Sequence, residues 1–200
     1  MLHLNSGHDY RFGGKDGDYS EIQKLCDSLD VKYVVKKTDL WDVIFNIRKE
    51  KNPCSLCAKM RRGILHDTAK EYGCNKIALG HHYDDAIGTV LMGLIYGGQV
   101  QAMLPRVKAK NYEGMELIRP MYCIHEEDII RWKNAHGLEF IQCACRFTEN
   151  CAASEDGSGN SKRQEVKLLL KRLKKDNPDI EKSVFNSIHS VCLDTMPGWK

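Results

Sequence analysis

Two cysteines three residues apart, in the segment NPCSLCAKMRRGIL, are the side chains with the clearest potential for chemistry. Cys54 and Cys57 stand where a helix is expected to begin, so both sulfur atoms can face one point. The helix dipole and the neighbouring Lys59, Arg61 and Arg62 favour the thiolate form. The pair could therefore bind a metal, act as a redox dithiol or belong to a hydrophobic core.

A second cysteine pair favours the metal-binding alternative. Cys143 and Cys145, in QCAC, follow a predicted strand whose end could lie at the same sheet edge as the first pair. A C-x-x-C pair supplies half of a four-ligand metal site, and the later pair could supply the remainder.

A histidine and aspartate cluster, LGHHYDDAIGT, is the second chemical feature. His81 and His82 follow a predicted strand, and Asp84 and Asp85 stand at the start of the next helix. Two carboxylates at the carboxyl end of a strand could bind Mg²⁺ or orient a nucleotide. Aspartates in a first helical turn also cap the helix, and from this segment alone capping is the simpler interpretation.

The string GGKD, from Gly13 to Asp16, resembles part of a phosphate-binding loop. Such a loop needs a buried strand before it and a helix N-terminus after it. The residues before Gly13, NSGHDYRF, are polar and rich in turn formers, and the nearest predicted strand, 1–4, ends too early. The pattern therefore predicts a glycine-rich turn before a helix.

The elements that must position these groups alternate between strands and helices along the chain. Apolar runs with β-branched residues predict strands, and apolar positions spaced three and four apart predict helices. Strands are predicted in MLHL, VKYVVK, NKIALG, MELIRP and LEFIQC. Helices are predicted in YSEIQKLCDSL, DLWDVIFNIRKEK, 54–72, DDAIGTVLMGLIYGG, HEEDIIRWKNAHG and two segments separated near Asn177 and Pro178.

This alternation favours an α/β fold with a mostly parallel sheet and helices on both faces. We expect one main α/β domain over 1–150 and a basic helical segment over 151–200. The segment 99–114 is predicted to be a loop over the sheet edge. The helix from Asp84 to Gly98 is apolar almost all round and is expected to be largely buried.

Composition indicates an ordinary globular protein. The 200 residues are 42% hydrophobic and 28% charged, with a net charge of +3. No apolar run approaches the ~18 residues of a membrane span, and no secretion signal is present, so the expected location is the cytoplasm. Nine cysteines in a reducing compartment are more often core residues, metal ligands or reactive thiols than disulfides.

The segment 162–175 carries seven lysines and arginines and a single acid. Val166, Leu169, Leu170 and Leu173 form a stripe that could be buried, so the basic side chains would project from the other faces. Such a helix can contact nucleic-acid phosphate or simply face solvent.

The motifs taken in order resemble the TtcA-type tRNA 2-thiocytidine synthetases of the PP-loop ATPase family, which have an adenine nucleotide alpha hydrolase-like fold. The resemblance rests on C-S-L-C-x-x-x-R-R-G-I-L, K-I-A-L-G-H-H-x-D-D-x-x-x-T, I-R-P and a late C-x-C. It implies ATP-dependent transfer of sulfur to C2 of a cytidine in the tRNA anticodon loop.

Carried over by position, the resemblance implies the following site residues. A [4Fe–4S] cluster would be held by Cys54, Cys57 and one later cysteine, with Cys145 favoured and Cys143 open. His82, Asp84, Asp85 and Thr89 match the nucleotide-side motif for ATP and Mg²⁺, with Asp84 and Asp85 as catalytic residues. Gly88 stands where the family usually has Glu or Gln.

The resemblance also implies that GGKD follows the second strand of the fold. The family's own phosphate loop, S-G-G-K-D-S, would then lie upstream of Met1, with the first βα unit absent. We expect such a chain to have a much lower affinity for ATP and to be inactive alone.

Expected partners are tRNA, ATP and a sulfur donor such as a cysteine desulfurase. No membrane partner is expected, and a homodimer is a candidate assembly. The rival functions are a non-catalytic zinc-binding RNA module, and a PP-loop enzyme that makes another nucleoside such as 2-thiouridine or lysidine.

Overall fold

The computed structural model of the chain describes residues 2–5, 19–49, 53–139 and 162–196. The chain divides into two compact units. The first comprises Met1–Ile77, Lys108–Leu117 and Lys133–Glu149, and the second comprises Ala78–Val107, Ile118–Trp132 and Asn150–Lys200.

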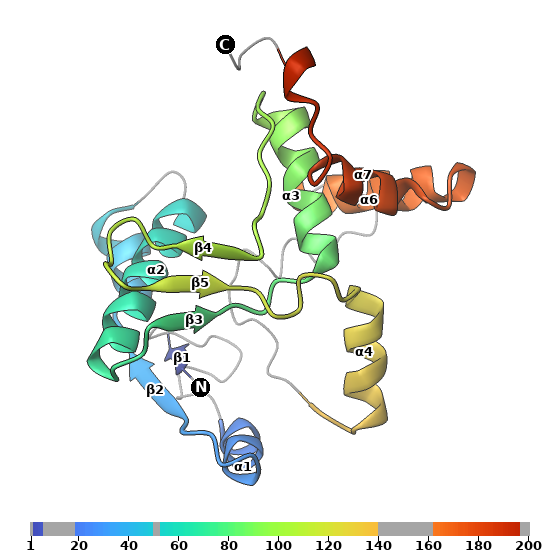
Figure 1. Cartoon of the computed structure of the whole chain (residues 1–200). Helices are drawn as coiled ribbons and strands as arrows, with labels where there is room; N and C mark the ends of the chain where they lie inside the picture. Colours follow the sequence, from blue (N-terminus) through green and yellow to red (C-terminus); the bar gives the residue numbers. More distant parts are fainter. Residues whose placement is uncertain (1, 6–18, 50–52, 140–161, 197–200) are drawn as a thin grey trace. The chain divides into compact units, whose positions relative to one another are not determined.

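A parallel strand pair and three helices make up most of the described part of the first unit (Figure 1). Strands β1 and β2 pair in parallel, with Leu2 opposite Val34. The elements are β1 (Leu2–Asn5), α1 (Ser20–Ser28), β2 (Val34–Lys37), the π-helix η2 (Asp42–Ile47) and α2 (Pro53–Glu71).

The buried side chains of this unit follow the spacing that the sequence predicts. Ile22 and Cys26, one helical turn apart on α1, are both buried. Leu40 and Ile44 are buried around η2, which packs against α2. The predicted stripe of α2 is half-buried along its length, at Cys57, Met60, Ile64, Leu65 and Ala69.

Three short strands form a second sheet, in the order β3-β5-β4 (Figure 1). They are β3 (Lys76–Ala78), β4 (Arg106–Lys108) and β5 (Glu116–Ile118). Two backbone hydrogen bonds, Glu116 N to Asn75 O and Leu79 N to Ile118 O, show that β3 and β5 are parallel. The carboxyl ends of β3 and β5 therefore lie at the same edge of the sheet.

Three helices, α3, α6 and α7, form the core of the second unit. Tyr83 and Ile87 on α3 pack against Val166 and Leu170 on α6, and Phe185 on α7 packs against this cluster. Figure 1 shows α3, α6 and α7 lying against one another. The elements are α3 (Tyr83–Tyr96), α4 (Glu126–Ala135), α6 (Lys162–Asp176), α7 (Ile180–Ser187) and the short 3-10 helix η3 (Leu193–Thr195).

The predicted α/β class is confirmed, and the predicted elements that lie within the described residues occur in the predicted order, with β4 in addition. Gly73 and Gly137 have positive φ angles of 67° and 60° where α2 and α4 were expected to stop. The string at Gly13 to Asp16 and most of the predicted strand LEFIQC lie outside the described residues. None of the described helices is both long and apolar enough to cross a membrane.

Three expectations about burial and the predicted loop were wrong. The segment 99–114 contains strand β4, which hydrogen-bonds to β5 as an antiparallel edge strand. The last turn of α3 is not buried, because Leu94, Ile95 and Tyr96 are 43–49% exposed. On α6, Val166 and Leu170 are buried, whereas Leu173 is 40% exposed.

Candidate functional site

The histidine and aspartate cluster lies where β3 passes into α3. Leu79, just after β3, is hydrogen-bonded to Ile118 of β5, and α3 begins at Tyr83. His81 and His82 occupy the turn between them, and Asp84 and Asp85 lie in the first turn of α3. The cluster is therefore at the carboxyl end of a parallel strand, where α/β sheets bind their ligands.

Asp85 is held by groups on both sides. Its Oδ2 accepts a hydrogen bond of 3.2 Å from the backbone N–H of His82, which is the capping interaction expected at a helix start. Its Oδ1 accepts a hydrogen bond of 3.0 Å from Arg163 Nη1. The side chain of Asp85 is only 18% exposed. The capping interpretation is therefore correct for Asp85, which also has a cationic partner.

Asp84 points to another helix. Its Oδ2 accepts a 2.8 Å hydrogen bond from the backbone N–H of Glu126, the first residue of α4. Asp84 therefore caps α4 with one oxygen atom, and the other oxygen has no hydrogen-bond partner among the described residues.

His82 lies between the two carboxylates. Its Nδ1 is 3.5 Å from Asp84 Oδ2, and its Nε2 is 3.4 Å from Asp85 Oδ2. Thr89 lies one turn further along α3, where its hydroxyl donates a 2.8 Å hydrogen bond to the Asp85 carbonyl oxygen. The structure thus brings His82, Asp84 and Asp85 together, while the Thr89 hydroxyl is bound to the backbone of its own helix.

The surroundings of His81 favour its neutral form. Burial is the main cause that lowers its pKa, and the charges of Arg119 and Arg163 lower it further against the opposing effect of Asp85. Its Nδ1 is buried and has no hydrogen-bond partner in the described part of the chain. A buried polar atom without a partner costs free energy, so this atom is a candidate ligand contact.

Two cations of helix α6, Arg163 and Lys167, make ion pairs at or beside this cluster that the sequence did not predict. Arg163 bonds to Asp85, and Lys167 Nζ lies 2.7 Å from Glu126 Oε2. The sequence placed both residues on a basic helix that could contact nucleic-acid phosphate or simply face solvent. Periodicity gives no signal for these contacts, since Arg163 is 78 residues from Asp85.

The first cysteine pair lies at the start of α2, as predicted. Cys54 and Cys57 are the second and fifth residues of the helix, and the Cys57 side chain is half-buried. The side-chain position of Cys54, and Cys143 and Cys145 altogether, lie outside the described residues. Within the residues that are described, no group of three or more His, Cys, Asp or Glu side chains could hold a metal ion.

Comparison with protein families identifies a PP-loop domain over residues 7–146. Two curated relatives, each 34% identical over 175 residues, are the tRNA-cytidine(32) 2-sulfurtransferase 2 of Francisella tularensis and the tRNA-cytidine(32) 2-sulfurtransferase 1 of Francisella philomiragia. The match covers 87% of this chain, but only 66% and 64% of the relatives. The chain thus spans slightly less than two thirds of their length.

A solved structure has the same fold. The U34-tRNA thiolase NcsA from Methanococcus maripaludis, determined with its [4Fe–4S] cluster, superimposes with a TM-score of 0.70. The superposition covers 98% of this chain and 62% of that one, at 23% sequence identity.

Proposed function

The chain belongs to the PP-loop domain family, and from this premise we propose that it acts in the ATP-dependent thiolation of tRNA, with C2 of an anticodon-loop cytidine as the acceptor. The observation that carries the proposal is the 34% identity to tRNA-cytidine(32) 2-sulfurtransferases over 175 residues. The cluster at the start of α3 supports it, because carboxylates and imidazoles at a strand's carboxyl end suit a nucleotide and its metal ion.

The nucleotide would be bound by His82, Asp84, Asp85 and Thr89. Asp84 is the better candidate for Mg²⁺, since its Oδ1 has no hydrogen bond among the described residues. Asp85 is already bonded to His82 N and to Arg163, so it would orient the turn. Mg²⁺ is usually held by one or two carboxylates together with water and substrate phosphates, which fits a single open carboxylate oxygen.

The iron–sulfur cluster would be held by Cys54, Cys57 and Cys145, with Cys143 as the alternative third ligand. Thiolates are the usual ligands of such clusters. Cys54 and Cys57 lie three residues apart on α2, which places them on one side of a helical turn. When bound, a [4Fe–4S] cluster with three protein ligands supplies an iron with an open position for sulfur.

The reaction would proceed in two balanced steps. The C2 oxygen of cytidine attacks the α-phosphorus of ATP and displaces pyrophosphate. A sulfur nucleophile then attacks C2, and the C2–oxygen bond breaks to release AMP.

The partners of this reaction would be tRNA, ATP and a sulfur donor such as a cysteine desulfurase. A homodimer is the assembly that we propose to test. The cytoplasm, where tRNA is found, would be the location.

The test is a thiolation assay with anaerobically reconstituted protein. The protein is incubated with ATP, Mg²⁺, sulfide and unthiolated tRNA, and the digested nucleosides are separated by chromatography and mass spectrometry. The protein used carries an S-G-G-K-D-S phosphate loop joined upstream of Met1, and we expect it to form 2-thiocytidine that disappears when ATP is omitted. Formation of 2-thiouridine or lysidine would show that the protein modifies another nucleoside. A colourless protein with stoichiometric zinc and no product would favour the zinc-binding RNA module.

A further inference from the structure

The ring of Tyr83 has two aromatic neighbours that come from distant parts of the chain. Tyr83 stands between His82 and Asp84 at the start of α3, and its side chain is buried. Its ring centroid lies 4.2 Å from that of His125, just before α4, and 4.4 Å from that of Phe185 on α7. All of these residues belong to the second unit. One ring therefore connects the turn before α3 to the α4 segment and to a C-terminal helix.

Backbone hydrogen bonds hold the start of α3 in register with the segment that leads into α4. The Tyr83 N–H donates a 3.0 Å bond to Ile124 O. Asp84 Oδ2 accepts the 2.8 Å bond from the Glu126 N–H. These two bonds lie on either side of His125, whose ring packs on Tyr83. The direction of the Asp84 carboxylate depends on this register, because a hydrogen bond of such length is lost when its two atoms separate by about 1 Å more.

Phe185 also connects α7 to the segment that follows β5. Its ring centroid lies 5.4 Å from that of Tyr122, whose side chain is buried. His189, just beyond α7, has its ring centroid 4.6 Å from that of Phe185, and its Nδ1 donates a 2.9 Å hydrogen bond to the Phe185 carbonyl oxygen. The Phe185 ring is thus in contact with aromatic rings of the turn, of the β5 segment and of its own end of the chain.

Helix α7 is itself anchored to α6 and to the core. Lys174 Nζ of α6 lies 2.6 Å from Glu181 Oε2, one turn before Phe185 on α7. Val184 and Phe185 both pack against the core cluster, but each is only half-buried, and the buried members of the cluster lie on α3 and α6. Removing the Phe185 ring should therefore disturb its neighbour Tyr83 more than the centre of the core.

We propose that Phe185 is a positioning residue for Asp84. By packing on Tyr83 together with His125, it holds the start of α3 against the α4 segment and so keeps the Asp84 carboxylate in place. Aromatic pairs at such centroid distances stabilise a structure beyond the area that they bury. The proposal rests on the proposed function only for the ligand that Asp84 would bind. It gives the C-terminal helices a part in the site itself, in addition to any contact with RNA.

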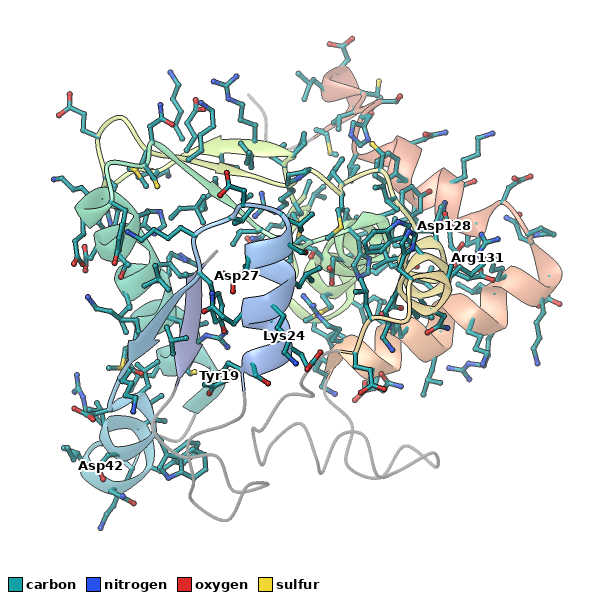
Figure 2. All side chains as sticks on the ribbon, turned by 90° about the horizontal axis from the view of Figure 1, so that it is seen from below. Tyr19, Lys24, Asp27, Asp42, Asp128 and Arg131 are labelled. Carbon is teal, nitrogen blue, oxygen red and sulfur yellow. The ribbon has the colours of Figure 1, made fainter. Side chains whose placement is uncertain are left out.

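The test compares substitutions in the full chain. Phe185→Leu keeps an apolar side chain and removes the ring, and Phe185→Tyr keeps the ring. Val184→Ala is the matched control, since Val184 neighbours Phe185 on α7, packs against the same cluster and has no ring to place on Tyr83. Arg131→Ala separates fraying of α4 from loss of the Tyr83 contact, because the exposed Arg131 pairs with Asp128 within α4 (Figure 2).

Amide hydrogen exchange, measured by NMR, reports on the two hydrogen bonds directly. The amides followed are those of Tyr83 and Glu126, and the amide of Val90, a buried residue of α3, is the core reference. We expect Phe185→Leu to raise the Tyr83 and Glu126 exchange rates about three- to tenfold relative to that of Val90, because an aromatic pair is lost. Phe185→Tyr should keep the wild-type rates, whereas Val184→Ala should change all three amides in proportion.

Two results would overturn the proposal. An equal change of the Tyr83, Glu126 and Val90 rates in Phe185→Leu would show that Phe185 only stabilises the unit as a whole. Wild-type rates in that variant would show that the turn does not depend on the ring. If Phe185→Leu does not fold, His125→Leu removes the other ring beside Tyr83, and unchanged relative rates in that protein contradict the proposal. The exchange measurement needs no ATP, tRNA or cluster, so its failure is distinct from a failure of thiolation.

Discussion

Adjacent carboxylates at the start of α3 have different surroundings, although the sequence presents them as an equivalent pair. Asp85 is bonded to the backbone of its own turn and to Arg163. Asp84 caps α4 with one oxygen atom, and its other oxygen makes no hydrogen bond among the described residues. The sequence predicts both aspartates as a site but cannot distinguish them, because their partners lie 42 and 78 residues away.

Capping and ligand binding by Asp84 can be separated with two substitutions. Asp84→Ala removes the cap of α4 and should cost about 0.5–2 kcal/mol of stability. Asp84→Asn keeps an oxygen that can accept the Glu126 N–H, so the free energy of unfolding should change little, because Asn caps as well as Asp. Both variants lose the negative charge that Mg²⁺ requires.

The measurement is thermal unfolding with and without Mg²⁺ and ATP. We expect ligand-induced stabilisation to be lost in both variants, while the unliganded Asp84→Asn protein melts close to the wild type. If Asp84→Asn retained the full ligand-induced shift, Asp84 would be a helix cap and no more.

At the scale of elements, the cations of α6 fall into two groups. Lys162, Arg163, Lys167 and Lys174 each pair with a carboxylate of the protein, at distances of 2.6–3.0 Å. Lys171, Arg172 and Lys175 are exposed and have no such pair among the described residues. A basic run in the sequence does not predict this division. The pair of Lys162 and Glu165 lies within α6 itself, whereas the other three pairs depend on where α3, α4 and α7 place their acids.

This division predicts which cations contact RNA. Replacing Lys171, Arg172 and Lys175 with Gln should flatten the dependence of tRNA affinity on salt by about 2–3 in logarithmic slope, if each contacts one phosphate. Replacing the paired Lys162, Lys167 and Lys174 should change the slope less, since Glu165, Glu126 and Glu181 already offset their charges. The measurement is filter binding or fluorescence over a salt series.

An equal slope in the wild type and the triple variant of Lys171, Arg172 and Lys175 would assign α6 a purely structural role. A larger effect of the paired lysines would show that RNA displaces the intramolecular pairs. Such displacement is feasible in energy, because exposed ion pairs contribute only about 0–1 kcal/mol.

The elements themselves were largely predictable, and the exceptions have physical causes. Helices α1, α2, α4 and α6 have apolar residues at helical spacing and were found where expected. Strand β4 was missed because it has only three residues, two of them basic, and its place is fixed by pairing with β5. The exposed end of α3 was missed because apolar composition does not reveal which half of a helix the other elements cover.

At the scale of the whole molecule, the proposed cluster is a contact between distant segments of one unit. Cys54 and Cys57 begin α2, and Cys143 and Cys145 come about 90 residues later, all within the ranges of the first unit. Spacing predicted the first pair as a local feature of a helix start. The meeting of the two pairs depends on the tertiary fold and stays a prediction.

Individual cysteine substitutions test that contact. A [4Fe–4S] cluster on three thiolates should be lost when any one ligand is removed, because each contributes directly to holding the iron atoms. We therefore expect Cys54→Ala, Cys57→Ala and one of Cys143→Ala or Cys145→Ala to bleach the broad visible absorption of anaerobically reconstituted protein. Cys192→Ala is the control, since Cys192 is exposed and lies in the second unit. Iron and sulfide analysis of each variant gives a second readout that does not depend on catalysis. Bleaching in both Cys143→Ala and Cys145→Ala would show that the cluster has a fourth protein ligand and no open iron position. Full colour in Cys57→Ala would show that Cys57 is not a cluster ligand and would contradict the assignment of the α2 pair.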